Sequence, residues 1–140
     1  AFVNQRLIAL NRREPGMSLD LLHALLNCTI TYFMIEGIGF GRGLGVLDLN
    51  KDRIESVLHL LNPHQLTEAE QQGIIEAFQP IRTRDILEIA EELDRSDRQA
   101  FDDAVLATFS IDAKREQIYD ALRTLVSIRY TVKDEADEAC

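Results

Sequence analysis

The chain has 140 residues, which suits one domain or two small packed subdomains, and its hydrophobic content of 46% is ample for a core. Its formal net charge of −9 comes entirely from the second half, because acidic and basic residues balance in residues 1–66. The strongly basic surface of a free-standing nucleic-acid binder is therefore missing, and any contact with DNA or RNA should come from the first half.

The first part of the chain predicts a strand, a buried helix and a second strand. The sequence FVNQRLIAL at residues 2–10 is typical of a strand, and a turn follows it. Ser18 is a suitable N-cap for a helix that runs to about residue 35. This helix is apolar around most of its circumference, so we expect it to be buried. After it come a glycine-rich run, a short strand and a short helix (residues 37–45, 46–49 and 50–61).

The second part predicts helices only. Thr67 and Glu70 form a capping box, and their helix should end at Phe78, before Pro80. A second helix with Ile86 facing inward is expected over 83–93, a third capped by Ser96, and a fourth capped by Asp112 that runs to about Val132. The charged residues 133–140 predict a disordered acidic tail.

These elements predict a mainly α (α+β) fold. A small strand–helix–strand piece would precede a four-helix C-terminal appendage. The expected organisation is an α/β region over 1–63, a helical region over 64–132 and the tail over 133–140.

The run GIGFGRGLG at residues 37–45 does not predict a nucleotide site. A dinucleotide fingerprint needs G-x-G-x-x-G after a strand, but this run lacks the spacing and follows a helix. No G-K-[ST] triplet of a P-loop is present either. We expect a turn that leaves the buried helix and lets another part of the chain approach closely.

No catalytic constellation and no metal site are predicted. The three histidines lack ligand spacing, and the many carboxylates of the second half are expected on solvated helix faces. Asp102 and Asp103 are adjacent on a helix and should point in different directions. Two cysteines, one in an apolar stretch and one at the end of the chain, suggest a reducing, cytoplasmic compartment.

Several basic residues of the first half are candidates for contacts with DNA. Arg42 is a guanidinium in the glycine run, a setting that suits phosphate or base-edge contact, although a lone loop arginine can also be simply solvated. Arg12, Arg13 and Lys51 could extend it into a weak basic edge. An ordinary mixed-charge surface is the alternative.

The segment over residues 18–63 resembles the end of the target-recognition region of bacterial adenine-specific DNA methyltransferases from restriction–modification systems. The likeness rests on a helix with LLHALLN, a glycine-rich turn, a strand with GVLDL and an exit with LNP (residues 21–27, 37–45, 45–49 and 61–63). Residues 81–129 are similar to the helical tail of the same proteins. The family's N-P-P-[YF] and F-x-G-x-G motifs are absent from this chain.

The resemblance implies a C-terminal portion of such an enzyme, without its catalytic domain. S-adenosylmethionine and the methyl transfer would belong to the parent enzyme, and this chain would itself bind no cofactor. It would help to hold and read the DNA through Arg42, Lys51, Arg12 and Arg13, and it would contact the remaining domains of the parent chain. The other interpretation left open is a helical protein-interaction or oligomerisation module with no nucleic-acid role.

Overall fold

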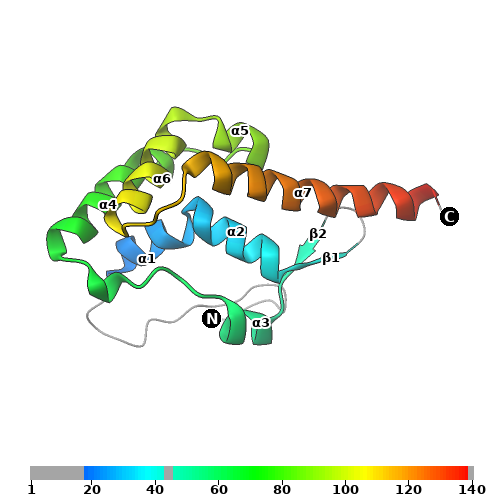
Figure 1. Cartoon of the computed structure of the whole chain (residues 1–140), viewed down its shortest axis with the longest axis horizontal. Helices are drawn as coiled ribbons and strands as arrows, with labels where there is room; N and C mark the ends of the chain where they lie inside the picture. Colours follow the sequence, from blue (N-terminus) through cyan, green and yellow to red (C-terminus); the bar gives the residue numbers. More distant parts are fainter. Residues whose placement is uncertain (1–17, 43–45, 139–140) are drawn as a thin grey trace.

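The computed structural model describes residues 18–42 and 46–138, and the fold over these residues is mainly α (Figure 1). Seven α-helices, one short 3-10 helix and one two-stranded ribbon account for the regular structure of the described part. The strand predicted at residues 2–10 lies outside it, as do Arg12 and Arg13.

The long apolar helix predicted from Ser18 is two helices, α1 (Leu19–Leu26) and α2 (Thr29–Ile38). Ser18 caps α1 as predicted, since its hydroxyl accepts a hydrogen bond from the Leu21 amide at 3.4 Å. The chain breaks at Asn27 and Cys28, where Cys28 adopts an extended backbone conformation. Among the described residues no single helix is long and apolar enough to cross a membrane, although α1 and α2 together, bent by 62°, meet that length and composition test.

A small antiparallel ribbon follows α2 directly. Strand β1 (Phe40–Arg42) pairs with β2 (Val46–Asp48), with Phe40 opposite Asp48 and Arg42 opposite Val46. Asn50 then caps α3 (Lys51–Val57), because its side chain accepts from the Arg53 amide at 3.0 Å. The 3-10 helix η1 (Pro63–Gln65) leads into the remaining helices.

Helix α4 (Glu68–Arg82) begins at the predicted capping box but continues through Pro80. The Thr67 amide donates to Glu70 at 2.8 Å, and the Glu70 amide donates back to the Thr67 hydroxyl at 3.3 Å. The expected end at Phe78 was wrong. Proline removes one backbone hydrogen bond, but Ile81 beyond it is buried in the core, and that burial favours the extra turn.

Three more helices complete the predicted set of four, with different bounds. The helix expected over 83–93 is only α5 (Ile89–Leu93), and Ile86, expected inside, is 50% exposed. Helix α6 (Ser96–Thr108) begins at the serine that was expected to cap it; the N-cap position is Arg95, which makes no side-chain capping bond. Helix α7 (Arg115–Glu138) begins three residues after Asp112 and continues through most of the expected disordered tail, so that part of the tail prediction is corrected.

Two apolar clusters hold these helices together. The larger joins α1, α4 and α6, with Phe78 and Phe101 in ring contact at 5.2 Å. The smaller joins α5 and α7, and Tyr32 and Phe33 of α2 pack against it. Helices from both sides of residue 63 therefore share one packed interior, while the boundary predicted there stays a prediction.

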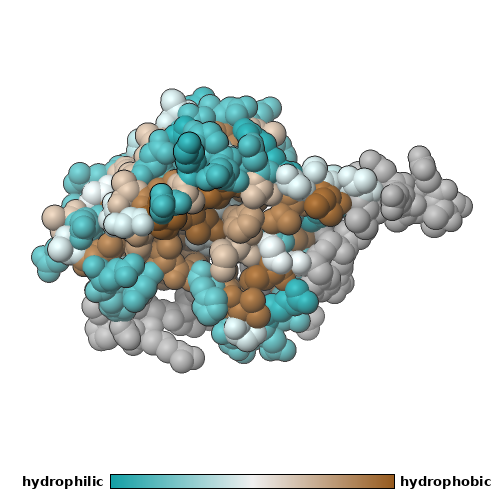
Figure 2. Space-filling view, in the orientation of Figure 1, coloured by the Kyte–Doolittle hydropathy of each residue, from teal (hydrophilic) through white to brown (hydrophobic). Residues whose placement is uncertain are grey.

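The apolar character of α2 reaches the surface. In Figure 2, hydrophobic residues gather over α2 and the adjoining part of α7, and hydrophilic residues cover the region of α5. Figure 1 shows α2 lying alongside α7, whose C-terminal end extends past the ribbon. Helix α2 thus links the interior of the helical part to the ribbon.

Candidate functional site

The four predicted DNA-contact residues are only partly within the described chain. Arg42 is the last residue of β1, and its backbone pairs with Val46. Lys51 is the first residue of α3, where its ammonium lies 3.5 Å from Glu55 and remains well exposed. The two cations are thus at the end of a strand and at the start of the helix that follows the ribbon, and their role in DNA binding stays a prediction.

The described part of the glycine run, residues 37–42, is the end of a helix followed by a short strand. Gly37 is within α2, and Gly39 ends it with φ −69° and ψ 167°. These angles are accessible to any residue, so glycine is not needed here for its backbone freedom. A Cβ on Gly39 would lie 2.4 Å from Leu47 Cδ1, whereas a Cβ on Gly37 would meet nothing within 4 Å. Gly39 therefore makes room for a side chain of β2.

Most arginines of the helical part form ion pairs with carboxylates of the described chain. The pairs include Arg82 with Asp20, Arg84 with Glu92 and Asp97, Arg98 with Glu92, Arg115 with Asp103, Arg123 with Asp94, and Arg129 with Glu36. Each pair neutralises a cation that could otherwise contact a phosphate. The helical part is therefore a poor surface for a nucleic-acid backbone.

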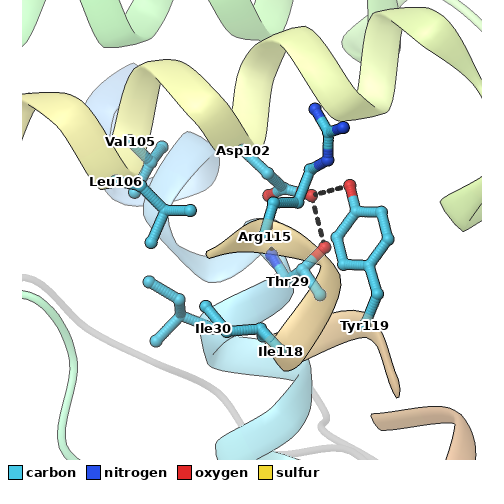
Figure 3. A pocket seen from close by; sticks show the side chains of 8 residues that line it. All are labelled: Thr29, Ile30, Asp102, Val105, Leu106, Arg115, Ile118 and Tyr119. Atoms are coloured by element: carbon cyan, nitrogen blue, oxygen red, sulfur yellow. Dashed lines mark hydrogen bonds between the residues drawn. The ribbon is translucent and has the colours of Figure 1, made fainter. Parts of the chain in front are cut away.

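The most elaborate polar site is at the break between α1 and α2. Asp102 of α6, 4% exposed, accepts hydrogen bonds from the Thr29 amide at 2.9 Å and the Thr29 hydroxyl at 2.5 Å. The Tyr119 hydroxyl of α7 donates to the same carboxylate at 2.8 Å (Figure 3). Thr29 is the first residue of α2, and the Cys28 side chain makes no capping bond. A side chain 73 residues further along the chain therefore caps this helix.

Arg98 lies one helical turn before Asp102 and contacts the other side of the break. Its Nη1 donates to the carbonyl of Asn27, the C-cap of α1, at 2.6 Å, and its Nε donates to Glu92 at 2.8 Å. Its guanidinium carbon lies 5.4 Å from the centroid of the Tyr32 ring. Nη2 has no hydrogen-bond partner among the described residues, and the aromatic contact partly compensates for that.

The Arg98–Asp102 pair matches the electrostatics of the two helix ends. The C-terminus of a helix carries partial negative charge and the N-terminus partial positive charge. Arg98 places a cation at the end of α1, and Asp102 places an anion at the start of α2. Burial raises the pKa of the Asp102 carboxyl, and the bonds from Thr29 and the charge of Arg98 oppose that rise.

A second group of charges determines the shape of the segment between α4 and α5. Arg84 donates to Glu92 at 2.8 and 3.0 Å and to Asp97 at 2.7 and 3.1 Å, and the Leu87 amide donates to Glu92 at 3.2 Å. Burial alone would raise the pKa of Glu92, but the hydrogen bonds from both arginines outweigh it and lower that pKa to about 2. These bonds replace the helix predicted over 83–88.

A small cavity adjoins Asp102 and is lined by residues of α2, α6 and α7 (Figure 3). Its volume of about 10 Å³ is close to the minimum that admits one water molecule. No group of three or more metal-ligating side chains occurs in the described part of the chain. The site can therefore hold helix ends in place, but it offers no room for a substrate.

Reasoning from the sequence missed the buried carboxylates. Asp102 and Glu92 were expected on solvated faces, but both are buried, whereas Asp103 is exposed beside Arg115. A signal was present in the sequence, because Arg98, Asp102 and Val105 lie on the same stripe of α6 as the inward Phe101. Two charges on an apolar stripe indicate buried partners.

The fold and this site define a mainly α protein whose helix ends are held by buried charges. No protein-family model, curated protein or solved structure matches the chain.

Proposed function

We propose that the chain is a non-catalytic DNA-recognition and structural part of a site-specific N6-adenine DNA methyltransferase. The observation that carries the proposal is the order of elements at residues 29–57, where an apolar helix leads through glycine into an antiparallel ribbon and a capped helix. This order agrees with the resemblance of residues 18–63 to target-recognition regions. A two-stranded ribbon also has a width that the major groove admits.

The distribution of charge supports a division of labour within the parent enzyme. The arginines of the helical part are paired with carboxylates, so this part would face away from DNA and pack on other domains. Arg42 at the end of β1 and Lys51 at the start of α3 would contact the duplex, with Arg12 and Arg13. The family resemblance implies that S-adenosylmethionine would be bound by the parent's catalytic domain.

Expression of the complete gene tests the proposal. The full-length protein should produce N6-methyladenine at one sequence motif in host DNA, detected by single-molecule sequencing. Absence of that modification, with the protein folded and supplied with S-adenosylmethionine, would contradict the proposed function. The 140-residue chain alone should bind DNA weakly in a gel-shift titration at low salt, and tight sequence-specific binding would contradict the division of labour.

Charge reversal separates the ribbon from the helical part. Arg42→Glu in the full-length enzyme should raise the KM for DNA by about ten-fold and reduce the salt dependence of binding by about one counterion. Arg123→Glu makes the same change in charge on α7, where Arg123 pairs with Asp94, and should leave the KM within about two-fold. Equal effects of the two variants would remove Arg42 from the DNA contacts.

A protein-interaction module is the second candidate, favoured by the segment before α5. Ile86 and Leu87 are adjacent and 50% and 39% exposed, and the bonds from Arg84 and Leu87 to Glu92 hold the segment in place. Burial of these two side chains against a partner would remove apolar surface from water, which favours association. If these two side chains mediate oligomerisation, sedimentation should show that the chain associates. The double substitution Ile86→Ser and Leu87→Ser should abolish this association, whereas the control Leu19→Ser should leave it unchanged. A monomer at all concentrations would exclude oligomerisation.

A further inference from the structure

We infer that Arg98 and Asp102 are positioning residues that determine the direction in which α2 presents the β1–β2 ribbon. The part of this inference that concerns DNA rests on the proposed function. The part that concerns the direction of α2 rests on geometry alone.

The ribbon has little freedom relative to α2. Helix α2 ends at Ile38, one glycine follows, and β1 starts at Phe40. The carbonyl of Ile38 also accepts a hydrogen bond from Arg53 of α3 at 2.7 Å, which joins the helix end to the element after the ribbon. A change in the direction of α2 therefore moves the ribbon with it.

Charged contacts from other helices hold α2 near both ends. At its start, Asp102 of α6 binds the amide and the hydroxyl of Thr29. Near its end, Glu36 receives a hydrogen bond from Arg129 of α7 at 2.6 Å, and these side chains are only 8% and 16% exposed. The smaller apolar cluster packs against the middle of α2 but supplies no directional bond.

The buried pair is better explained by direction than by stability. A continuous helix over 19–38 would satisfy its own backbone groups, and apolar residues in place of buried charged groups are often as stable or more stable. Hydrogen bonds, unlike apolar contacts, depend on angle. Arg98 holds the C-cap carbonyl of α1 while Asp102 holds the first amide of α2, so the two bonds together specify the bend between the helices.

The length of α2 amplifies small errors at the bend. Ten helical residues span about 15 Å, so rotation by about 20° at residue 28 would displace the ribbon by about 5 Å. A hydrogen bond to a base or phosphate tolerates only a few tenths of an ångström. Loss of the pair should therefore disturb DNA recognition even though neither residue is near the ribbon.

Distance measurement in the 140-residue chain tests the geometric part. Nitroxides on p-acetylphenylalanine at Lys51 and Glu76, both exposed, report the position of the start of α3, just after the ribbon, relative to α4 and leave Cys28 unchanged. Asp102→Ala should shift or broaden the distance distribution by several ångström, and the milder Asp102→Asn should do so partly. Asp103→Ala is the matched control on the same helix, where the side chain is 56% exposed, and should match the wild type.

Far-UV circular dichroism establishes whether each variant is folded, and Asp102→Asn serves if Asp102→Ala does not fold. A distribution identical to wild type in the folded Asp102 variants would overturn the inference about direction. A distribution altered equally by Asp103→Ala would overturn it too, because general loosening of α6 would then be the cause.

Kinetics of the full-length methyltransferase test the part that concerns DNA. Asp102→Asn should raise the KM for DNA about ten-fold and leave the affinity for S-adenosylmethionine unchanged, whereas Asp103→Asn should change neither. An altered distance with unchanged KM would overturn the link between the bend and recognition. Absence of methylation by the wild-type enzyme would contradict the proposed function, and the distance measurement would still decide the role of Asp102.

Discussion

Two alanine substitutions in the glycine run should have opposite effects on stability. Gly37 lies in the last turn of α2, and a Cβ there would meet no atom within 4 Å. Gly37→Ala should therefore stabilise the chain by about 0.5–1 kcal/mol, since glycine is the poorer helix former. At Gly39 a Cβ would come within 2.4 Å of Leu47 Cδ1, 2.7 Å of Leu47 Cγ and 3.2 Å of the Ile35 carbonyl oxygen.

The cost at Gly39 follows from the size of the overlap. An ordinary carbon contact is 3.4–4 Å, so Leu47 must move by at least 1.0 Å, and the Ile35 carbonyl leaves little room on the other side. Forcing an extra carbon into a packed site costs about 1–3 kcal/mol. Because the backbone angles of Gly39 suit any residue, this steric term is the only penalty expected.

Urea unfolding followed by circular dichroism measures both effects. A double-mutant cycle identifies the cause, because Leu47→Ala removes both clashing atoms and should make Gly39→Ala nearly neutral in that background. Gly39→Ala as stable as Gly37→Ala would refute the reasoning. So would a Gly39→Ala penalty that persists in full when Leu47 is alanine.

Three further outcomes are expected for the 140-residue chain. Hydrogen bonds from Arg84 and Arg98 outweigh burial at Glu92, and bonds from Arg84 lower the pKa of Asp97, so the pKa of each carboxyl is about 2. The stability that these carboxylates contribute above pH 4.5 should therefore be lost as the pH falls toward 2. In urea titrations, the free energy of unfolding of Glu92→Gln should fall less steeply with decreasing pH than that of the wild type. Ser110 has φ 52°, so Ser110→Gly should raise the free energy of unfolding by about 0.5 kcal/mol, and a lower urea midpoint would contradict this. Cys28 is buried, and its burial raises the pKa of its thiol. In a Cys140→Ser background, Ellman's reagent should therefore react with Cys28 only as fast as the chain unfolds. Rapid reaction in the folded chain would exclude that burial.

Local capping signals in the sequence predicted the starts of α1 and α4, but not the start of α7. Ser18 and the Thr67–Glu70 capping box were confirmed because the cap and its target lie within three residues of one another. Their effect does not depend on the rest of the fold. The end of α4 was misplaced because the signal from Pro80 competes with the burial of Ile81, which depends on distant neighbours.

The break between α1 and α2 could not be predicted from residues 18–38 alone. No proline interrupts that segment, and Leu21, Leu25 and Phe33 suit one continuous buried helix. The groups that stabilise the break come from α6 and α7, 71 and more residues away. The exposure of Ile86 has the same cause, because Glu92 binds the Leu87 amide and Arg84 instead of leaving the segment helical.

The candidate DNA contacts and the buried pair differ in how a sequence can reveal them. Arg42 stands out because it is the one cation in a run of glycines, although its function depends on a partner molecule. Arg98 and Asp102 stand out only once the inward stripe of α6 is known, since charged residues are otherwise expected in solvent. Placing each charge on the face of its own helix would have found them.

The acidic second half therefore does more than form a solvated surface, because its charged residues also hold elements of the first half in place. Two of its charged residues bind the helix ends of the neutral first half, and Arg129 binds Glu36 near the ribbon. Each of these bonds joins an element before residue 63 to one after it, and each is largely removed from water, where an unpaired charge is costly. Separating the two halves would leave buried charges and helix ends without partners on both sides. The direction of α2 is thus a joint property of the two halves, and a recognition ribbon attached to α2 would depend on α6 and α7 as much as on its own sequence.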